Sequence, residues 1–185
     1  MTDGIRRAAA PELTDGSVRL RPWRLSDATA VTAACQDPDL QHWLPVPVPY
    51  LVEHAVGFVT EFAQQQWADD QGAPFAVEAA GSGELLGSVA LKDIDRVGGT
   101  AEVGYWVVPG SRGRGVAQRA VSLISAWAFA ALGLQRLEFR VEPANAASCV
   151  VAERVGAVFV EQLPASEVIH GTPRDTARYV LLGGA

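Results

Sequence analysis

The apolar positions in the first third of the chain predict one strand and two helices. From Val18 to Trp23 the residues Val, Leu and Pro alternate with Arg, Arg and Trp, which is typical of a strand with one buried face. Ser26 and Asp27 then offer a helix N-cap, and the apolar residues that follow at helical spacing predict a helix that ends near Asp37-Pro38. Another apolar stripe predicts a helix over 52–67.

The segment between these two helices is rich in proline. Three prolines fall within five residues of the stretch 43–50, and each removes a backbone donor and fixes φ. Neither a regular helix nor a central strand tolerates that spacing. We expect a loop with an aromatic residue at each end, Trp43 and Tyr50.

The middle of the chain has the pattern of an antiparallel meander. Two strand-like runs, 75–79 and 85–91, are joined by a Gly-Ser-Gly-Glu turn, which is typical of a hairpin. A second glycine-containing turn, 93–100, leads into a third apolar run, 101–108. Three consecutive antiparallel strands are therefore predicted.

The second half of the chain contains the strongest helical stripe, 117–131, which Gly133 closes. Apolar and charged residues then alternate over 137–142, which predicts a strand. A strand, a helix and another strand in this order form a right-handed crossover, so the strands on either side of the helix should be parallel.

A further short helix and two strands complete the predicted order. Ala146–Val155 is the helix, with Asn145 as its N-cap and Gly156 at its end. The final strands are expected at 158–160 and 177–182. The whole order indicates an α+β fold with one mixed sheet.

The length and composition of the chain indicate one folded domain. It has 185 residues, of which 49% are hydrophobic and 19% are charged, as in ordinary globular proteins. We expect residues 1–16 to be an N-terminal extension and 17–185 to be a single domain. No apolar run approaches the roughly 20 residues of a membrane span, and no apolar segment follows Arg6 and Arg7, so neither the membrane nor secretion is expected. A cytoplasmic protein is the expectation.

Charge and cysteine content exclude several other classes. The net charge of −6 argues against general nucleic-acid binding, which depends on many basic residues. Cys35 and Cys149 lie in no Cys-x-x-Cys or His/Cys cluster, so we expect no metal site.

The turn Arg112–Ala117 carries the clearest chemical signal in the sequence. Its glycines let successive N–H groups point into one concavity, and the strongest predicted helix begins directly after it. The helix dipole and two arginines add positive charge, so a pyrophosphate is the natural ligand. The turn lacks the Gly-Lys-Ser/Thr of a P-loop and the third glycine of a dinucleotide fingerprint.

This turn resembles the signature of the GNAT superfamily of acyl-CoA-dependent N-acetyltransferases, Gln/Arg-x-x-Gly-x-Gly/Ala after the fourth strand. Arg112, Gly115 and Ala117 fill its three fixed positions, and the element order resembles that fold over 18–182. Within the superfamily the chain is most similar to the RimJ and RimL branch of ribosomal-protein acetyltransferases. The supporting segments are Val18–Pro22, Glu102–Val107, Asn145–Ser148 and Arg178-Tyr179.

The resemblance implies a fold and a donor site. The fold is a mixed sheet of about six to seven strands, splayed between the fourth and fifth and flanked by about four helices. The donor is acetyl-CoA or another acyl-CoA, with its pantetheine paired like an added strand. The residues implied to hold it are Val107, Val108, Arg112, Gly113, Arg114, Gly115, Val116, Ala117 and Asn145.

The resemblance also implies candidates for proton transfer. An amine must lose a proton before attack, and the departing thiolate must be stabilised. Many members use a tyrosine for the thiolate at the position that is Ala152 here, so Ser148 is the expected replacement, although it could merely help to cap its helix. Glu167, in the loop where RimL-like enzymes have a glutamate, is the expected base. The strand carboxylate Glu102 is the rival.

The acceptor is the least defined part of the expected function. Trp43 and Tyr50 flank the loop that walls the acceptor site in the family, and ordinary packing is an equal explanation for both. A primary amine is expected, either a protein N-terminal α-amino group or a small molecule such as an antibiotic or a polyamine. A non-catalytic acyl-CoA-binding module is a further alternative, and a homodimer is compatible with the resemblance.

Overall fold

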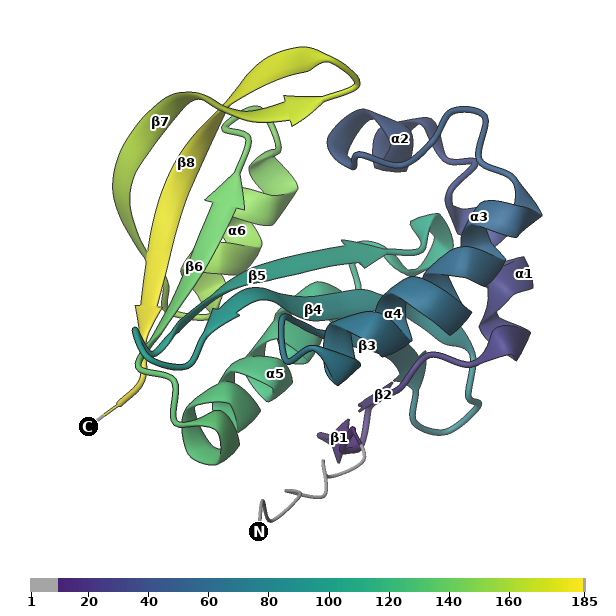
Figure 1. Cartoon of the computed structure of the whole chain (residues 1–185), viewed down its shortest axis with the longest axis horizontal. Coiled ribbons are helices and arrows are strands. Elements are labelled where there is room, and N and C mark those ends of the chain that lie inside the picture. The colour runs from purple at the N-terminus through teal and green to yellow at the C-terminus, as the bar shows by residue number, and fades with distance from the viewer. Residues whose placement is uncertain (1–9, 185) are drawn as a thin grey trace, which may run out of the picture.

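One eight-stranded sheet forms the centre of the structure, a computed structural model that describes residues 10–184 (Figure 1). The strand order is β1-β2-β3-β4-β5-β6-β8-β7, and β5 with β6 is its parallel pair. The strands are β1 Leu13–Thr14, β2 Val18–Arg21, β3 Ala73–Ala79, β4 Leu85–Asp95, β5 Thr100–Val107, β6 Arg136–Val141, β7 Val158–Ile169 and β8 Thr172–Leu182.

Helices cover both faces of this sheet. A π-helical turn, Phe58–Phe62, joins α3 to α4, so the described residues form five helices when these two are taken together. The helices are α1 Ala28–Ala34, α2 Pro38–Trp43, α3 Val52–Gly57, α4 Ala63–Ala68, α5 Val116–Leu132 and α6 Ala146–Arg154.

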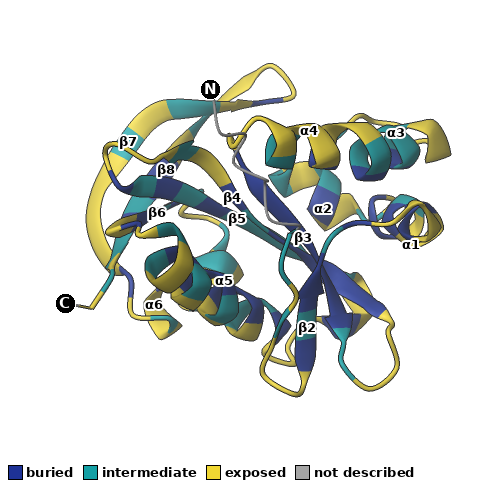
Figure 2. Cartoon of the chain, turned by 60° about the horizontal axis from the view of Figure 1, so that its bottom comes forward, coloured by how far each residue is buried: buried dark blue, intermediate teal, exposed yellow. Residues whose placement is uncertain are grey.

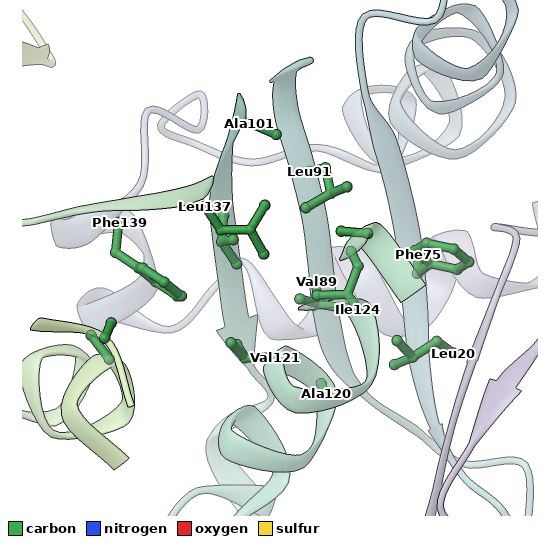
Figure 3. Packing of buried hydrophobic residues seen from close by; sticks show 14 of the residues in the cluster. Leu20, Phe75, Val89, Leu91, Ala101, Ala120, Val121, Ile124, Leu137 and Phe139 are labelled. Atoms are coloured by element: carbon green, nitrogen blue, oxygen red, sulfur yellow. The ribbon is translucent and has the colours of Figure 1, made fainter. Parts of the chain in front are cut away.

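The larger core lies between α5 and the sheet (Figure 3). One face of α5 presents Val121 and Ile124, which are fully buried against Val89, Leu91 and Leu137 of the strands. Side chains two apart on a strand share a face, which is why β4 contributes both Val89 and Leu91. Figure 2 shows the same division, with buried central strands and exposed outer sides of the helices.

A second core fills the opposite face beneath α1 and α3. Ala76 of β3 points to this side and packs with Val31 and Val59, all of them buried. Trp23 stacks on Trp106 of β5, with ring centroids 6.3 Å apart. Because this core also contacts Trp106 of β5, the helices of the first third of the chain are anchored beside an opening in the sheet.

That opening lies between β5 and β6. The two strands pair only over Thr100–Glu102 and Arg136–Glu138, and beyond this they diverge (Figure 1). Strand β6 pairs with β8 along its whole length, whereas beyond Glu102 β5 has only β4 as a neighbour. The backbone of Val103–Val107 therefore has one unpaired edge, as the expected splay requires.

The expected fold class is confirmed, with one strand and one helix more than the ranges expected. The additional helix is α2. Asp37 accepts a hydrogen bond from the Leu40 N–H at 3.0 Å, and Pro38 occupies the first helical turn, where its missing N–H costs nothing. In the sequence, this proline indicated only the end of the preceding helix.

Two other differences concern exposure and strand length. Arg21 was expected on the less buried face of its strand, yet its side chain is buried, because the second core covers that face as well.

The last two strands extend far beyond 158–160 and 177–182, as one long hairpin. Most of β7 is exposed on both faces, so it has no apolar alternation that could have marked its length.

The N-terminal segment is described from residue 10 onward. Residues 1–9, including most of the expected extension and the arginines at 6 and 7, lie outside the described part of the chain. Leu13 and Thr14 form β1 beside β2. Over residues 10–184 the structure has no helix with the length and apolar character needed to cross a membrane.

Candidate active site

A cavity of about 830 Å³ opens where β5 and β6 diverge. Its walls come from the exposed edge of β5, the turn before α5, the first turns of α6, the end of α2 and the tip of the β7–β8 hairpin. Residues far apart in the sequence therefore meet at one site. The cavity extends along β5 from Val107 to Glu102, about 17 Å of extended chain.

The glycine-rich turn closes one end of this cavity. Gly113 and Gly115 have φ of 73° and 75°, in the left-handed region that glycine adopts without strain. Among the described residues, no protein acceptor receives the N–H groups of Gly113, Arg114 or Gly115. Together with the free N–H groups in the first turn of the 17-residue α5, they form a group of unpaired donors that suits an anion.

The two arginines of the turn have different surroundings. Arg112 lines the cavity and pairs with Asp37 at 2.5 Å and Asp39 at 3.0 Å, which ties the turn to the start of α2. Arg114 is absent from the cavity wall and lines a second cavity of about 530 Å³ beside Asp15. The side chain of Arg112, but not that of Arg114, therefore lies at this site.

Of the two neighbouring valines expected to contact the pantetheine, only Val107 lies at the cavity. Val107 lines the cavity at the open edge of β5. The Val108 N–H instead donates to the Leu86 carbonyl at 2.8 Å, and Val108 is not part of the cavity wall. Val116 and Ala117, at the start of α5, do line it.

The first turn of α6 brings a hydroxyl to the cavity. Asn145 caps this helix by accepting from the Ser148 N–H at 3.1 Å, and both residues line the cavity. The Tyr105 hydroxyl donates to the Ser148 carbonyl at 3.0 Å and so connects β5 to α6 across the opening. Burial raises the pKa of Tyr105 to about 12, so its hydroxyl keeps its proton at neutral pH.

Charged side chains gather at the other end of the cavity. Glu102 of β5 forms ion pairs with Lys92, its cross-strand neighbour on β4, and with Arg140 of β6 at 3.5 Å. Glu142 pairs with Arg174 of β8 at 3.1 Å. All five residues line the cavity. Both glutamates therefore have their charge balanced by cations already present in the protein.

Glu167 lies at the same end but has different surroundings. It belongs to β7 and not to the loop expected from the sequence, because β7 continues past a bulge at Pro164–Ser166. Burial raises the pKa of its carboxyl, and the Glu102 carboxylate raises it further, against the opposing effects of Lys92 and Arg140. Within the described residues the Glu167 side chain has no ion-pair partner.

The two aromatic residues expected at the acceptor site are separated by the fold. Trp43, the last residue of α2, lines the cavity. Tyr50 is buried in the second core beside Cys35 and does not reach the cavity wall. His170, in the β7–β8 turn, contacts the Gln41 carbonyl of α2 at 2.9 Å, so the hairpin tip and α2 meet beside the cavity.

The site also contains five residues that the sequence did not predict for it: Lys92, Tyr105, Arg140, Glu142 and Arg174. Lys92 could have been predicted from the sequence, because the hairpin places it opposite Glu102 and opposite charges pair across antiparallel strands. The others meet only through the splay and the long hairpin. No group of His, Cys, Asp and Glu in the described chain is arranged to hold a metal ion.

Comparison with known proteins agrees with this geometry. Residues 17–158 match the family described as acetyltransferase (GNAT) domain. "Putative ribosomal N-acetyltransferase YdaF" of Bacillus subtilis strain 168 is 31% identical over 121 residues, which are 64% of each chain and so just under two thirds of that relative. The spermidine N(1)-acetyltransferase of Escherichia coli strain K12 is 26% identical over 163 residues, covering 88% of this chain and 84% of that protein.

A solved structure shows the same fold over nearly the whole chain. Mycobacterium smegmatis RimJ, in complex with CoA-disulfide, has a TM-score of 0.82 at 24% identity, covering 96% of this chain and 88% of that one. The match over residues 17–158 agrees with the open sheet and the glycine-rich turn before α5. This chain therefore belongs to the GNAT family of N-acetyltransferases. Solved structures of RimJ and RimL are among those that share its fold.

Proposed function

We propose that this chain transfers an acetyl group from acetyl-CoA to the α-amino group of a protein or peptide N-terminus, by direct attack in a ternary complex. The observation that carries the proposal is the continuous cavity, which joins an anion-binding turn at one end to the unpaired carboxyl of Glu167 at the other. The similarity to a putative ribosomal N-acetyltransferase favours a protein as the acceptor.

The donor end fits a CoA thioester by its chemistry. The N–H groups of Gly113–Ala117 and the start of α5 would hold the pyrophosphate, and Arg112 would add its charge by exchanging Asp39 for a phosphate oxygen. The unpaired edge of β5 at Val107 would bind the pantetheine amides as an added strand. The thioester supplies an activated acyl group when bound.

The acceptor end supplies the proton transfers. Glu167 accepts a proton from the incoming ammonium, which leaves a neutral amine able to attack. After attack, the nitrogen loses its second proton as the carbon–sulfur bond breaks, and the departing thiolate takes up a proton to leave as the free thiol of CoA. The Ser148 hydroxyl, in the first turn of α6, donates a hydrogen bond to this leaving sulfur. Glu102, held between Lys92 and Arg140, keeps its negative charge paired and positions these two cations.

A direct assay separates this proposal from a binding module without activity. The protein is mixed with acetyl-CoA and a panel of lysine-free peptides with free N-termini, and thiol release is followed together with the acetylated product. Release of thiol with acetylation of the α-amino group is expected. Tight CoA binding with no thiol release for any amine would reject the enzymatic proposal.

Small-molecule amines are the second candidate acceptor. The similarity to the Escherichia coli spermidine N(1)-acetyltransferase is the observation that favours them. Spermidine and simple monoamines therefore belong in the same assay.

The turn gives a prediction for the donor. Gly115→Ala should weaken CoA binding by about 5- to 30-fold, because an alanine at φ 75° costs about 1–2 kcal/mol. No atom lies within 4 Å of the added methyl group, so the effect should come from the backbone alone. Isothermal titration with CoA measures it.

Gly110→Ala is the matched control for this prediction. Gly110 lies in the same loop, has no positive φ and is equally free of neighbours, so CoA affinity should stay unchanged. Equal losses in both variants would show that the left-handed turn is not the binding element.

The hydroxyl of α6 gives a second prediction. Ser148→Ala should lower kcat by about 10-fold or more while CoA affinity stays constant, because a hydrogen bond to a charged group contributes about 1.5–3 kcal/mol. Single-turnover kinetics and CoA titration provide the two values. An unchanged kcat would remove Ser148 from the mechanism and leave it the role of a helix-cap residue.

A further inference from the structure

The acceptor end of the cavity contains enough carboxylates to suggest a site for a polycation. Glu102, Glu142 and Glu167 all line it. A polyamine has several ammonium groups, and binding it requires several carboxylates whose charge is free to pair with them. The number of acidic residues alone would therefore favour a polyamine acceptor.

The ion pairs of this structure lead to the opposite conclusion. Glu102 is engaged by both Lys92 and Arg140, and Glu142 accepts from Arg174 at 3.1 and 3.3 Å. Both glutamates are largely shielded from solvent, with side-chain exposures of 13% and 19%. An ammonium group entering this site would have to displace a cation that is part of the protein and already partly desolvated.

The charge of the cavity as a whole points the same way. Its wall holds four carboxylates and five Lys or Arg side chains among the described residues, although the whole chain has a net charge of −6. A cavity with a slight positive excess suits a CoA pyrophosphate and repels a molecule with three or four positive charges. Glu167 is the acceptor-end carboxyl that has no ion-pair partner within residues 10–184.

From this pairing we infer that Lys92, Arg140 and Arg174 are specificity-determining residues that exclude polyamines and select an acceptor with a single ammonium group. The inference rests on the proposed function for its acceptor end. One unpaired carboxyl, Glu167, matches the one charge of a lysine-free peptide N-terminus. Paired carboxylates surround it and leave no partner for a second ammonium group.

The test uses binding as well as turnover, with spermidine as the polycation. Spermidine is titrated into the CoA-saturated wild-type protein and into Arg174→Gln, which removes the cation paired with Glu142 and keeps most of the side-chain volume. We expect weak binding to the wild type and about 10-fold tighter binding to the variant. In the acetylation assay, the preference for a lysine-free peptide over spermidine should fall by at least 10-fold.

Two further variants make the comparison specific. Arg140→Gln removes one of the two cations beside Glu102 and should shift the preference in the same direction, so a folding defect in one variant does not decide the result. Arg178→Gln is the matched control, because Arg178 lies on the same strand as Arg174, pairs with Glu138 and Glu161 and is absent from the cavity wall. It should leave spermidine binding unchanged.

The outcomes separate the inference from the proposed function. Wild-type protein that binds or acetylates spermidine as well as the peptide overturns the inference, as does an equal gain in Arg178→Gln. If no amine is acetylated, the proposed function fails, and the order of spermidine affinities still decides whether these cations exclude polycations.

Discussion

Glu167→Gln is expected to lower kcat/KM for amine acetylation by about 100- to 1,000-fold, with little change in CoA affinity. Glutamine keeps the shape of the side chain but cannot accept the proton of the incoming ammonium, and a positioned general base contributes about 10²–10⁴ in rate. Stopped-flow thiol detection with a lysine-free peptide measures the loss. CoA titration shows whether the donor site is intact.

The choice of Glu167 over Glu102 follows from their partners. Glu102 is already engaged by Lys92 and Arg140, so an incoming ammonium group would have to displace one of these cations to reach its carboxylate. Glu167 is raised in pKa by burial and then by the Glu102 carboxylate, which brings it nearer to the neutral pH at which a base works best.

The pH profile provides an independent readout of the same assignment. The ionised form of Glu167 is the active one, so kcat/KM should rise with pH as the carboxyl loses its proton. Because its pKa is raised, this acidic limb should lie above the ordinary glutamate value of about 4.3. The limb should be absent from Glu167→Gln.

Glu102→Gln is the control that can contradict this assignment. Its loss of activity should be smaller, because it disturbs the positions of Lys92 and Arg140 without removing the base. A larger loss in Glu102→Gln than in Glu167→Gln, with the acidic limb retained by the latter, would make the strand glutamate the base.

The parts of this fold that the sequence predicts are those with local patterns. The stripe of α5 and the turn before it are continuous in the chain, and the parallel pairing of β5 with β6 follows from the handedness of a single crossover. The donor half of the site lies on these elements, so the resemblance to the GNAT superfamily implied Val107 and the residues from Arg112 to Ala117.

The acceptor half depends on contacts between distant segments. Glu167 and Arg174 face the cavity only because a long exposed hairpin, with a bulge in β7, turns back across β6. Neither strand has a buried face along its full length, so period-two patterning could not reveal them. Tyr50 was predicted at the acceptor site but lies elsewhere. Its position beside a proline-rich loop did not reveal that its side chain packs into the second core.

Arg21→Met is expected to lower the free energy of unfolding by about 3–5 kcal/mol, the usual cost of leaving buried charges without their partner. Arg21 is 3% exposed and donates to both Asp27 carboxylate oxygens at 2.8 Å and to Glu78 at 2.5 Å. Its removal leaves two buried carboxylates that no other cation replaces in full. Urea unfolding of both proteins, followed by circular dichroism, measures the difference.

Arg19→Met separates this effect from the general loss of a positive charge. Arg19 lies on the same strand and also reaches Glu78, at 3.3 Å, but its side chain is 36% exposed, so its removal should cost about 1 kcal/mol or less. Equal losses would show that net charge, and not the buried network, sets the stability. A large loss confined to Arg21→Met would mean that β2, β3 and the start of α1 are held together by a buried ionic contact. The second core, which anchors these elements beside the open edge of β5, would then depend on it.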